Sequence, residues 1–143
     1  MGKNHGRVRT SVALGSERGQ NLVEFALVVL ILLLLVFGTA ELGRAWMARN
    51  ILTGAAREAV RVAAVPAPGG GWNGPAATAR ATTILSSAGL TSATATVEDA
   101  TAPFGAVTVT VNYDFPVVLV GFIPGLNNAI IPLSSTTTMR REY

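Results

Sequence analysis

Residues 17–38 read ERGQNLVEFALVVLILLLLVFG, and this stretch decides what kind of protein the chain encodes. From Gln20 to Ala40 there are 21 residues, of which 16 are apolar. About 20 such residues cross the hydrocarbon core of a bilayer as a helix. A chain of 143 residues has little protein with which to surround so long an apolar run. The pattern therefore predicts a transmembrane helix at 20–40 rather than a buried core helix.

Basic residues gather in front of this span. Residues 1–19 hold four Lys or Arg and one Glu, which gives 4 − 1 = +3, whereas residues 20–143 hold seven basic and seven acidic side chains. The positive-inside rule keeps such a leader in the cytoplasm and sends the C-terminal part across the membrane. Apart from two close pairs, the remaining arginines are scattered, so the sequence predicts no nucleic-acid-binding patch.

The helical pattern continues beyond the span. We expect one helix over 20–64, because Pro66 disfavours a helical conformation at Val65. An apolar stripe recurs at three- and four-residue steps, and the C-terminal domain can cover only one face of the helix. The members of the stripe are Leu42, Trp46, Leu52, Ala56, Ala59, Val60 and Ala63.

The same helix also contains pairs of oppositely charged residues and three glycines. The pairs Glu41/Arg44 and Glu58/Arg61 have the i,i+3 spacing of local ion pairs. Three glycines, Gly38, Gly43 and Gly54, allow close approach of a second helix. We expect them to mark self-association, although they would also be tolerated facing the domain or solvent.

Residues 65–143 have the pattern of a small α+β domain. A loop rich in Gly and Pro at 66–75 precedes a predicted helix over 75–88, for which Gly89 is a natural C-cap. Alternating apolar residues predict a strand at 107–115, with weaker strands at 91–98 and 130–141. Pro132 in the last strand indicates an edge or a bulge. The apolar segment 115–126 is either core or an exposed patch that contacts a neighbour, and the sequence leaves both open.

Enzyme chemistry is not expected. The chain has no cysteine, and its one histidine, His5, lies in the leader. The usual nucleophile–base sets and metal clusters are therefore missing from the rest of the chain. The carboxylates of Glu98, Asp99 and Asp114 are interpreted as solvated loop or strand-end charges. We accordingly expect no catalytic residue, no metal and no cofactor.

Three stretches in order resemble the TadE-like branch of the type IV pilins. The first is a G-x-x-x-x-E-F start at Gly19–Phe25, as in a class III signal peptide. The second resembles F-G-x-x-E-x-G-R and covers Phe37–Arg44, and the third resembles A-A-R-E-A-x-R and covers Ala55–Arg61. The resemblance is specific over residues 18–62 and looser beyond. It implies a pilin-like α+β fold with a long N-terminal membrane helix.

The family resemblance implies how the chain is processed. A prepilin peptidase would cut between Gly19 and Gln20, so that residues 1–19 are a cleaved leader. Many type IV pilins have Phe or Met where this chain has Gln20, which could be methylated or could cyclise. The precursor would lie in the bacterial inner membrane, work with a pilus assembly platform, and end in an extracellular filament.

Glu24 is a charged residue at the start of the predicted membrane span. A carboxylate deep in hydrocarbon costs on the order of 3 kcal/mol on insertion scales, and less near the interface. The resemblance implies that Glu24, with Phe25 next to it, docks the N-terminal amine of a neighbouring subunit. The plainer interpretation is a boundary residue whose carboxylate reaches water.

The resemblance implies a structural subunit that polymerises with itself, either a major or a minor pilin. Two other interpretations remain. One is a bitopic membrane anchor of a pilus assembly machine that never polymerises. The other is a secreted binding domain cut after Ala40, since Gly38-Thr39-Ala40 has the small residues of a secretory cleavage site. The three predict mature chains that begin at Gln20, are uncut, or begin at Glu41.

Overall fold

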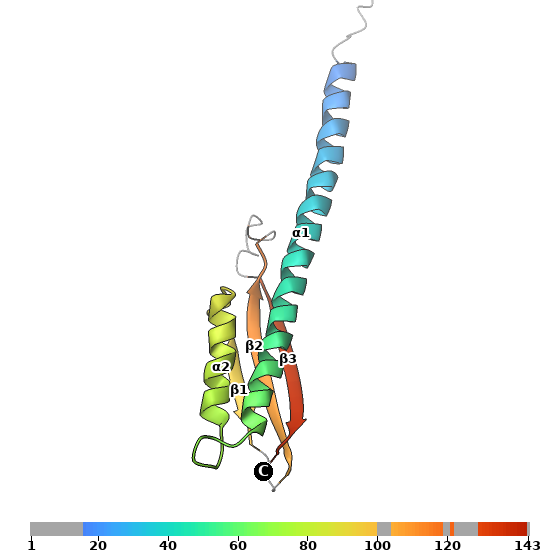
Figure 1. The fold of residues 1–143 in the computed structure, drawn as a ribbon. Helices are drawn as coiled ribbons and strands as arrows, with labels where there is room; N and C mark the ends of the chain where they lie inside the picture. The colour runs from blue at the N-terminus through green and yellow to red at the C-terminus, as the bar shows by residue number, and fades with distance from the viewer. Residues whose placement is uncertain (1–15, 100–103, 119–120, 122–128, 143) are drawn as a thin grey trace, which may run out of the picture. The chain divides into compact units, whose positions relative to one another are not determined.

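The computed structural model describes residues 16–99, 104–118, 121 and 129–142, with side chains from 19 onwards (Figure 1). Its elements are α1 (Ser16–Ala64), α2 (Gly74–Ser87), β1 (Thr94–Glu98), β2 (Ala106–Pro116) and β3 (Ile130–Arg140). A long apolar helix, a second helix and a three-stranded antiparallel sheet confirm the predicted α+β, pilin-like class. The chain forms two compact units, Met1–Phe37 and Gly38–Tyr143, so their boundary falls inside α1.

The two helices end where local signals predict. α1 ends at Ala64, two residues before Pro66, whose ring disfavours a helical residue in front of it. The helix begins at Ser16, four residues before the predicted start. No Pro interrupts residues 16–19, and the single Gly there is tolerated in a helix at a cost of about 1 kcal/mol.

The second helix is bounded by two glycines with different roles. Gly89 follows α2 at φ +79, a left-handed conformation that suits glycine at a C-cap. The N–H of Leu90 then donates to the carbonyl of Leu85 at 2.9 Å. Gly74 opens the helix beside the indole of Trp72, and a Cβ at this position would overlap that ring.

The sheet has the order β1-β2-β3, with β2 in the centre and antiparallel pairing on both sides. Pairing runs without interruption from Ala106↔Arg140 to Pro116↔Ile130. Pro132 therefore sits on an edge strand and not at a bulge, the first of the two predicted alternatives. On one face of the sheet, threonine hydroxyls meet across the strands, as at Thr110–Thr136, 3.1 Å apart.

The other face of the sheet packs against both helices. The core cluster takes Leu52, Ala55, Ala56, Ala59, Val60 and Ala63 from α1, Ala77, Ala81 and Leu85 from α2, and Val107, Val109 and Val111 from β2. The members of the predicted stripe from Leu52 onwards lie in this core. Its first two members do not, because Leu42 is 71% and Trp46 66% exposed. The buried run of α1 begins only at Ala48.

The C-terminus is joined to the end of α1. The N–H of Glu142 donates to the carbonyl of Ala64 at 3.0 Å. The Arg141 side chain pairs with Asp99 at 3.1 Å and lies 5.7 Å from the centre of the Trp72 ring. These contacts bring together the end of α1, the loop before α2 and the last residues after β3.

Candidate functional site

The N-terminal half of α1 exposes its apolar side chains. The exposed large apolar side chains between Leu22 and Phe37 each have between 45% and 69% of their surface accessible. Within the described residues, α1 from Gly19 is long and apolar enough to cross a membrane, and none of its most apolar window is buried. Such a surface needs a lipid or protein partner, because an apolar patch of this extent is unusual on a soluble monomer.

The predicted processing and docking residues lie at the start of this segment. Gly19 and Gln20 belong to α1, and both are exposed. Gln20 and Glu24 are one helical turn apart, so they share a face with Val23, Leu27 and Ile31 around a shallow hollow on the helix surface. Phe25 points elsewhere and is also exposed. The structure thus brings Gly19, Gln20 and Glu24 together.

Glu24 forms no ion pair with another described side chain. Ion pairs among the described residues join Glu41 to Arg44, Glu58 to Arg80 and Asp99 to Arg141. A carboxylate at the edge of an exposed apolar helix therefore has no cation within its own described chain. This arrangement leaves it available to water, to lipid headgroups or to another subunit.

No described atom beyond their own helix backbone lies close to the three helix glycines that were predicted to pack against a second helix. A Cβ built at Gly38, Gly43 or Gly54 meets nothing within 4 Å. Among the described residues, therefore, nothing packs closely enough to require glycine at these positions. Gly43 and Gly54 lie on exposed turns, and Gly38 is half-buried. Close approach of another helix remains a prediction for all three.

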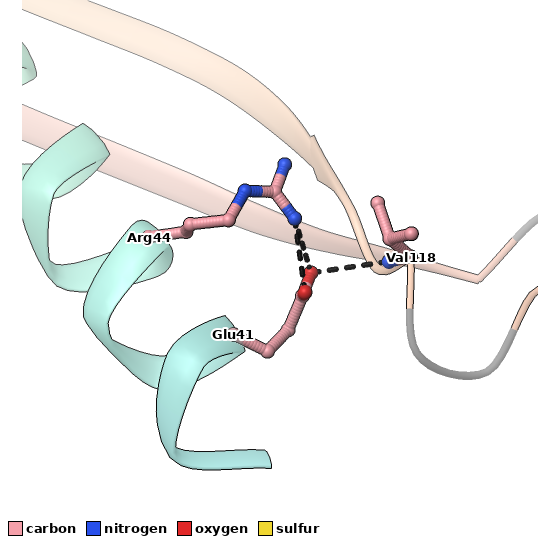
Figure 2. A network of polar contacts seen from close by, with 3 residues as sticks. All are labelled: Glu41, Arg44 and Val118. Carbon is pink, nitrogen blue, oxygen red and sulfur yellow. Dashed lines mark hydrogen bonds and ion pairs between the residues drawn. The ribbon is translucent and has the colours of Figure 1, made fainter. Parts of the chain in front are cut away.

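A polar network joins α1 to the end of the central strand, and only its part within α1 could be predicted from the sequence. The predicted Glu41/Arg44 pair forms: Nη1 of Arg44 donates to both carboxylate oxygens of Glu41, at 2.8 and 2.9 Å. The carboxylate also accepts the N–H of Val118 at 3.1 Å (Figure 2). Only 15% of the Glu41 side chain is exposed. No local signal could have indicated Val118, which is 77 residues away.

The aromatic ring of Phe115 completes this network. The guanidinium carbon of Arg44 lies 5.0 Å from the ring centre, within the range of a cation–π contact. Phe115 is buried, whereas Val118 is 53% exposed. The apolar segment 115–126 therefore begins in the core and reaches the surface by Val118. Residues 119–120 and 122–128 lie outside the described part, so neither predicted alternative is decided for the whole segment.

The second predicted ion pair is wrong. Glu58 pairs with Arg80 of α2 at 3.3 Å instead of with Arg61 on its own helix. Glu58 is half-buried on the side of α1 that faces α2, whereas Arg61 lies on an exposed face. The spacing rule gives only local opportunities, and here a residue from the neighbouring helix takes the carboxylate.

No metal chemistry is indicated within the described residues. No group of three or more His, Cys, Asp or Glu there is placed to hold a metal ion. Within this described part, the structure brings together the Glu41–Arg44 pair with its backbone donor and two further ion pairs. It also presents an exposed apolar segment of α1, up to Phe37, that carries Glu24. These arrangements suit binding and assembly.

Comparison with known proteins supports the predicted resemblance. Residues 19–61 match the family described as TadE-like protein, which confirms the resemblance over the part of the chain from Gly19 to Arg61. This stretch covers the exposed apolar segment, Glu24 and the Glu41–Arg44 pair. No curated protein and no solved structure matches the chain significantly.

Proposed function

We propose that this chain is a structural subunit of a Tad-type pilus, inserted in the bacterial inner membrane through α1 and later polymerised through the same helix. The observation that carries the proposal is the exposed apolar half of α1, which lies within the stretch that matches the TadE-like family. Such a surface suits a bilayer before assembly and a bundle of neighbouring helices afterwards. The α+β domain would then form the outside of the filament.

Processing fits the same scheme. A prepilin peptidase would cut between Gly19 and Gln20 on the cytoplasmic side, and the apolar segment would be retained. Glu24 would then lie one helical turn from the new N-terminus. Pairing it with the terminal amine of a neighbouring subunit offsets the cost of removing a carboxylate from water and disfavours a shifted register. If Gln20 cyclised, this amine would be lost.

Polymerisation by this helix has a geometric requirement. Contacts that join different faces of identical subunits and do not close produce helical filaments. The exposed face of α1 that carries Gly43, Gly54, Leu42 and Trp46 offers a second helix both close approach and apolar side chains. We propose that this face packs against α1 of a neighbouring copy, as a major or a minor pilin.

The decisive experiment is the intact mass and N-terminal sequence of the protein from cells with and without their prepilin peptidase. A start at Gln20 that depends on the peptidase is the expected result. The same spectrum shows whether Gln20 is free, methylated or cyclised. An uncut chain in both strains would leave a membrane anchor of the pilus machine, and a start at Glu41 in both would leave a secreted domain.

A further inference from the structure

The end of the domain at which β2 stops and β3 starts carries exposed apolar side chains. Val118 follows β2 and is 53% exposed, and Ile130 opens β3 and is 57% exposed. Ile131 pairs with Phe115 and is also exposed. Exposure of three aliphatic side chains to water at one end of the sheet is unfavourable, so a partner that removes them from water would stabilise this end.

This end of the sheet lies beside the turn of α1 that contains Glu41. The bond from the N–H of Val118 to Glu41 places the end of β2 beside the turn of α1 that holds Glu41, Leu42 and Arg44 (Figure 2). Leu42 is 71% exposed on that same turn. We refer to Leu42, Val118, Ile130 and Ile131 together as the apolar collar.

The surroundings of the collar have the composition of a membrane interface. Along the chain, the exposed apolar residues of α1 run from Leu22 to Phe37 and continue at Leu42 and Trp46. Tryptophan is enriched at the level of lipid headgroups, and arginine near the end of a span places its guanidinium among them. Arg44, about half exposed, stands at this level.

We propose that the apolar collar rests in the interfacial layer of the lipid bilayer from which α1 emerges, before the subunit is assembled. The occupant of this surface is lipid, because Leu42 of the collar stands on α1 five residues after Phe37, the last of the exposed apolar run whose length and composition suit a bilayer. The proposal rests on the membrane insertion that is part of the proposed function. It adds a second point of contact with lipid, made by the domain itself.

Glu41 is the positioning residue of this arrangement. Its carboxylate receives two contacts from Arg44 and one from the backbone of Val118. Pairing and hydrogen bonding reduce the cost of holding a carboxylate close to lipid. The same contacts join Val118 to α1. Loss of Glu41 therefore removes the bond that holds Val118 against α1, whereas Ile130 keeps its pairing with Pro116.

The chain offers a direct test because it contains no cysteine. Single substitutions Val118→Cys, Ile130→Cys and Thr138→Cys are each labelled with a bimane fluorophore in the full chain. The protein is reconstituted at one copy per nanodisc, in mixed zwitterionic and anionic phospholipids brominated on the shallow acyl carbons. Bimane at 118 and 130 should lose most of its fluorescence relative to unbrominated discs, whereas bimane at 138, on the polar face of the sheet, should not.

Second variants isolate the role of Glu41. Glu41→Ala should reduce quenching at 118 and leave quenching at 130 in place. Glu58→Ala removes a carboxylate from the same helix together with its ion pair, and should leave both unchanged. Unchanged quenching at 118 in Glu41→Ala would overturn the positioning role.

Other outcomes separate this inference from the function on which it rests. If bimane at 118 and 130 is quenched no more than bimane at 138, the collar proposal is overturned. This holds even if the chain is shown to be processed at Gln20 in cells. Shielding that appears only with two or more copies per disc would also overturn it, in favour of a subunit contact. Strong quenching of a chain that no peptidase cuts would support the collar and refute the pilin.

Discussion

Leu52 and Leu42 provide a matched test of which part of α1 belongs to the domain. Both are leucines on the same helix, ten positions apart, and both fall on the stripe predicted from sequence. Leu52 is 0% exposed within the core, whereas Leu42 is 71% exposed. Replacing each by alanine removes the same atoms from opposite environments. The effects on domain stability and on assembly should therefore separate.

The expected sizes follow from this burial. Leu→Ala at a fully buried site loses the transfer free energy of the side chain and leaves a cavity, and typically costs about 3–5 kcal/mol. In a domain of this size each kcal/mol lowers the unfolding midpoint by about 4–8 °C, so Leu52→Ala should lower it by more than about 10 °C. Leu42→Ala should change stability by no more than about 0.5 kcal/mol.

The assay is thermal and denaturant unfolding of the full chain in detergent, followed by tryptophan fluorescence. Trp72 reports on the domain, because it is half-buried and lies beside Arg141. The amount of filament recovered from cells gives the second readout. Leu42→Ala should lower it without lowering stability, since the exposed leucine would be covered only on contact with lipid or a neighbour. Equal destabilisation by the two variants would refute this account of α1.

Further predictions concern single contacts. Gly74→Ala places a methyl group in the indole of Trp72 and should destabilise the domain by about 1–3 kcal/mol, measured by the same unfolding assay; an unchanged midpoint would contradict the local packing. Glu58→Ala breaks an ion pair with Arg80 whose partners are each about half exposed, and should cost no more than about 1 kcal/mol; a larger loss in denaturant unfolding would show a buried role. Glu24→Ala should leave membrane insertion and the cut after Gly19 intact but prevent filament formation, scored by mass and by sheared filament yield; filaments at the normal level would remove its docking role.

Local signals explain why the elements could be predicted. Pro66 ends α1, Gly89 caps α2, and strict alternation over 107–115 gives β2, so each of these elements carries its own information in the sequence. The apolar span is equally local, because length and composition alone define it. The fold class needed nothing beyond such signals.

The sequence of α1 alone could not show which of its apolar residues the domain buries. Period alone identified an apolar stripe, but it could not show how far along α1 the domain extends. The domain covers the helix from about Ala48 onwards, so Leu42 and Trp46 share the period of the core without being in it. Along the chain, they follow the exposed apolar run of α1 that ends at Phe37, and their apolar side chains make them resemble core residues in sequence.

Contacts between residues that are distant in sequence also could not be predicted. The rule for neighbouring helix residues predicted both Glu41/Arg44 and Glu58/Arg61, yet only the first pair forms. Glu58 meets Arg80 because α2 packs beside that turn, and this depends on the tertiary fold. The bond from Val118 to Glu41 likewise arises only once β2 has paired and packed.

The position of Glu41 also bears on how the chain is processed. A cut after Ala40 would make Glu41 the first residue, and the backbone N–H groups of the first helical turn would have no partners within the helix. The turn that holds Glu41 and Arg44 would then fray, and with it the carboxylate that accepts the Val118 N–H. A cut after Gly19 leaves this turn in the middle of α1. The network joining α1 to β2 therefore favours processing that retains the apolar segment, because only then is the helix that positions Glu41 continuous on both sides of it.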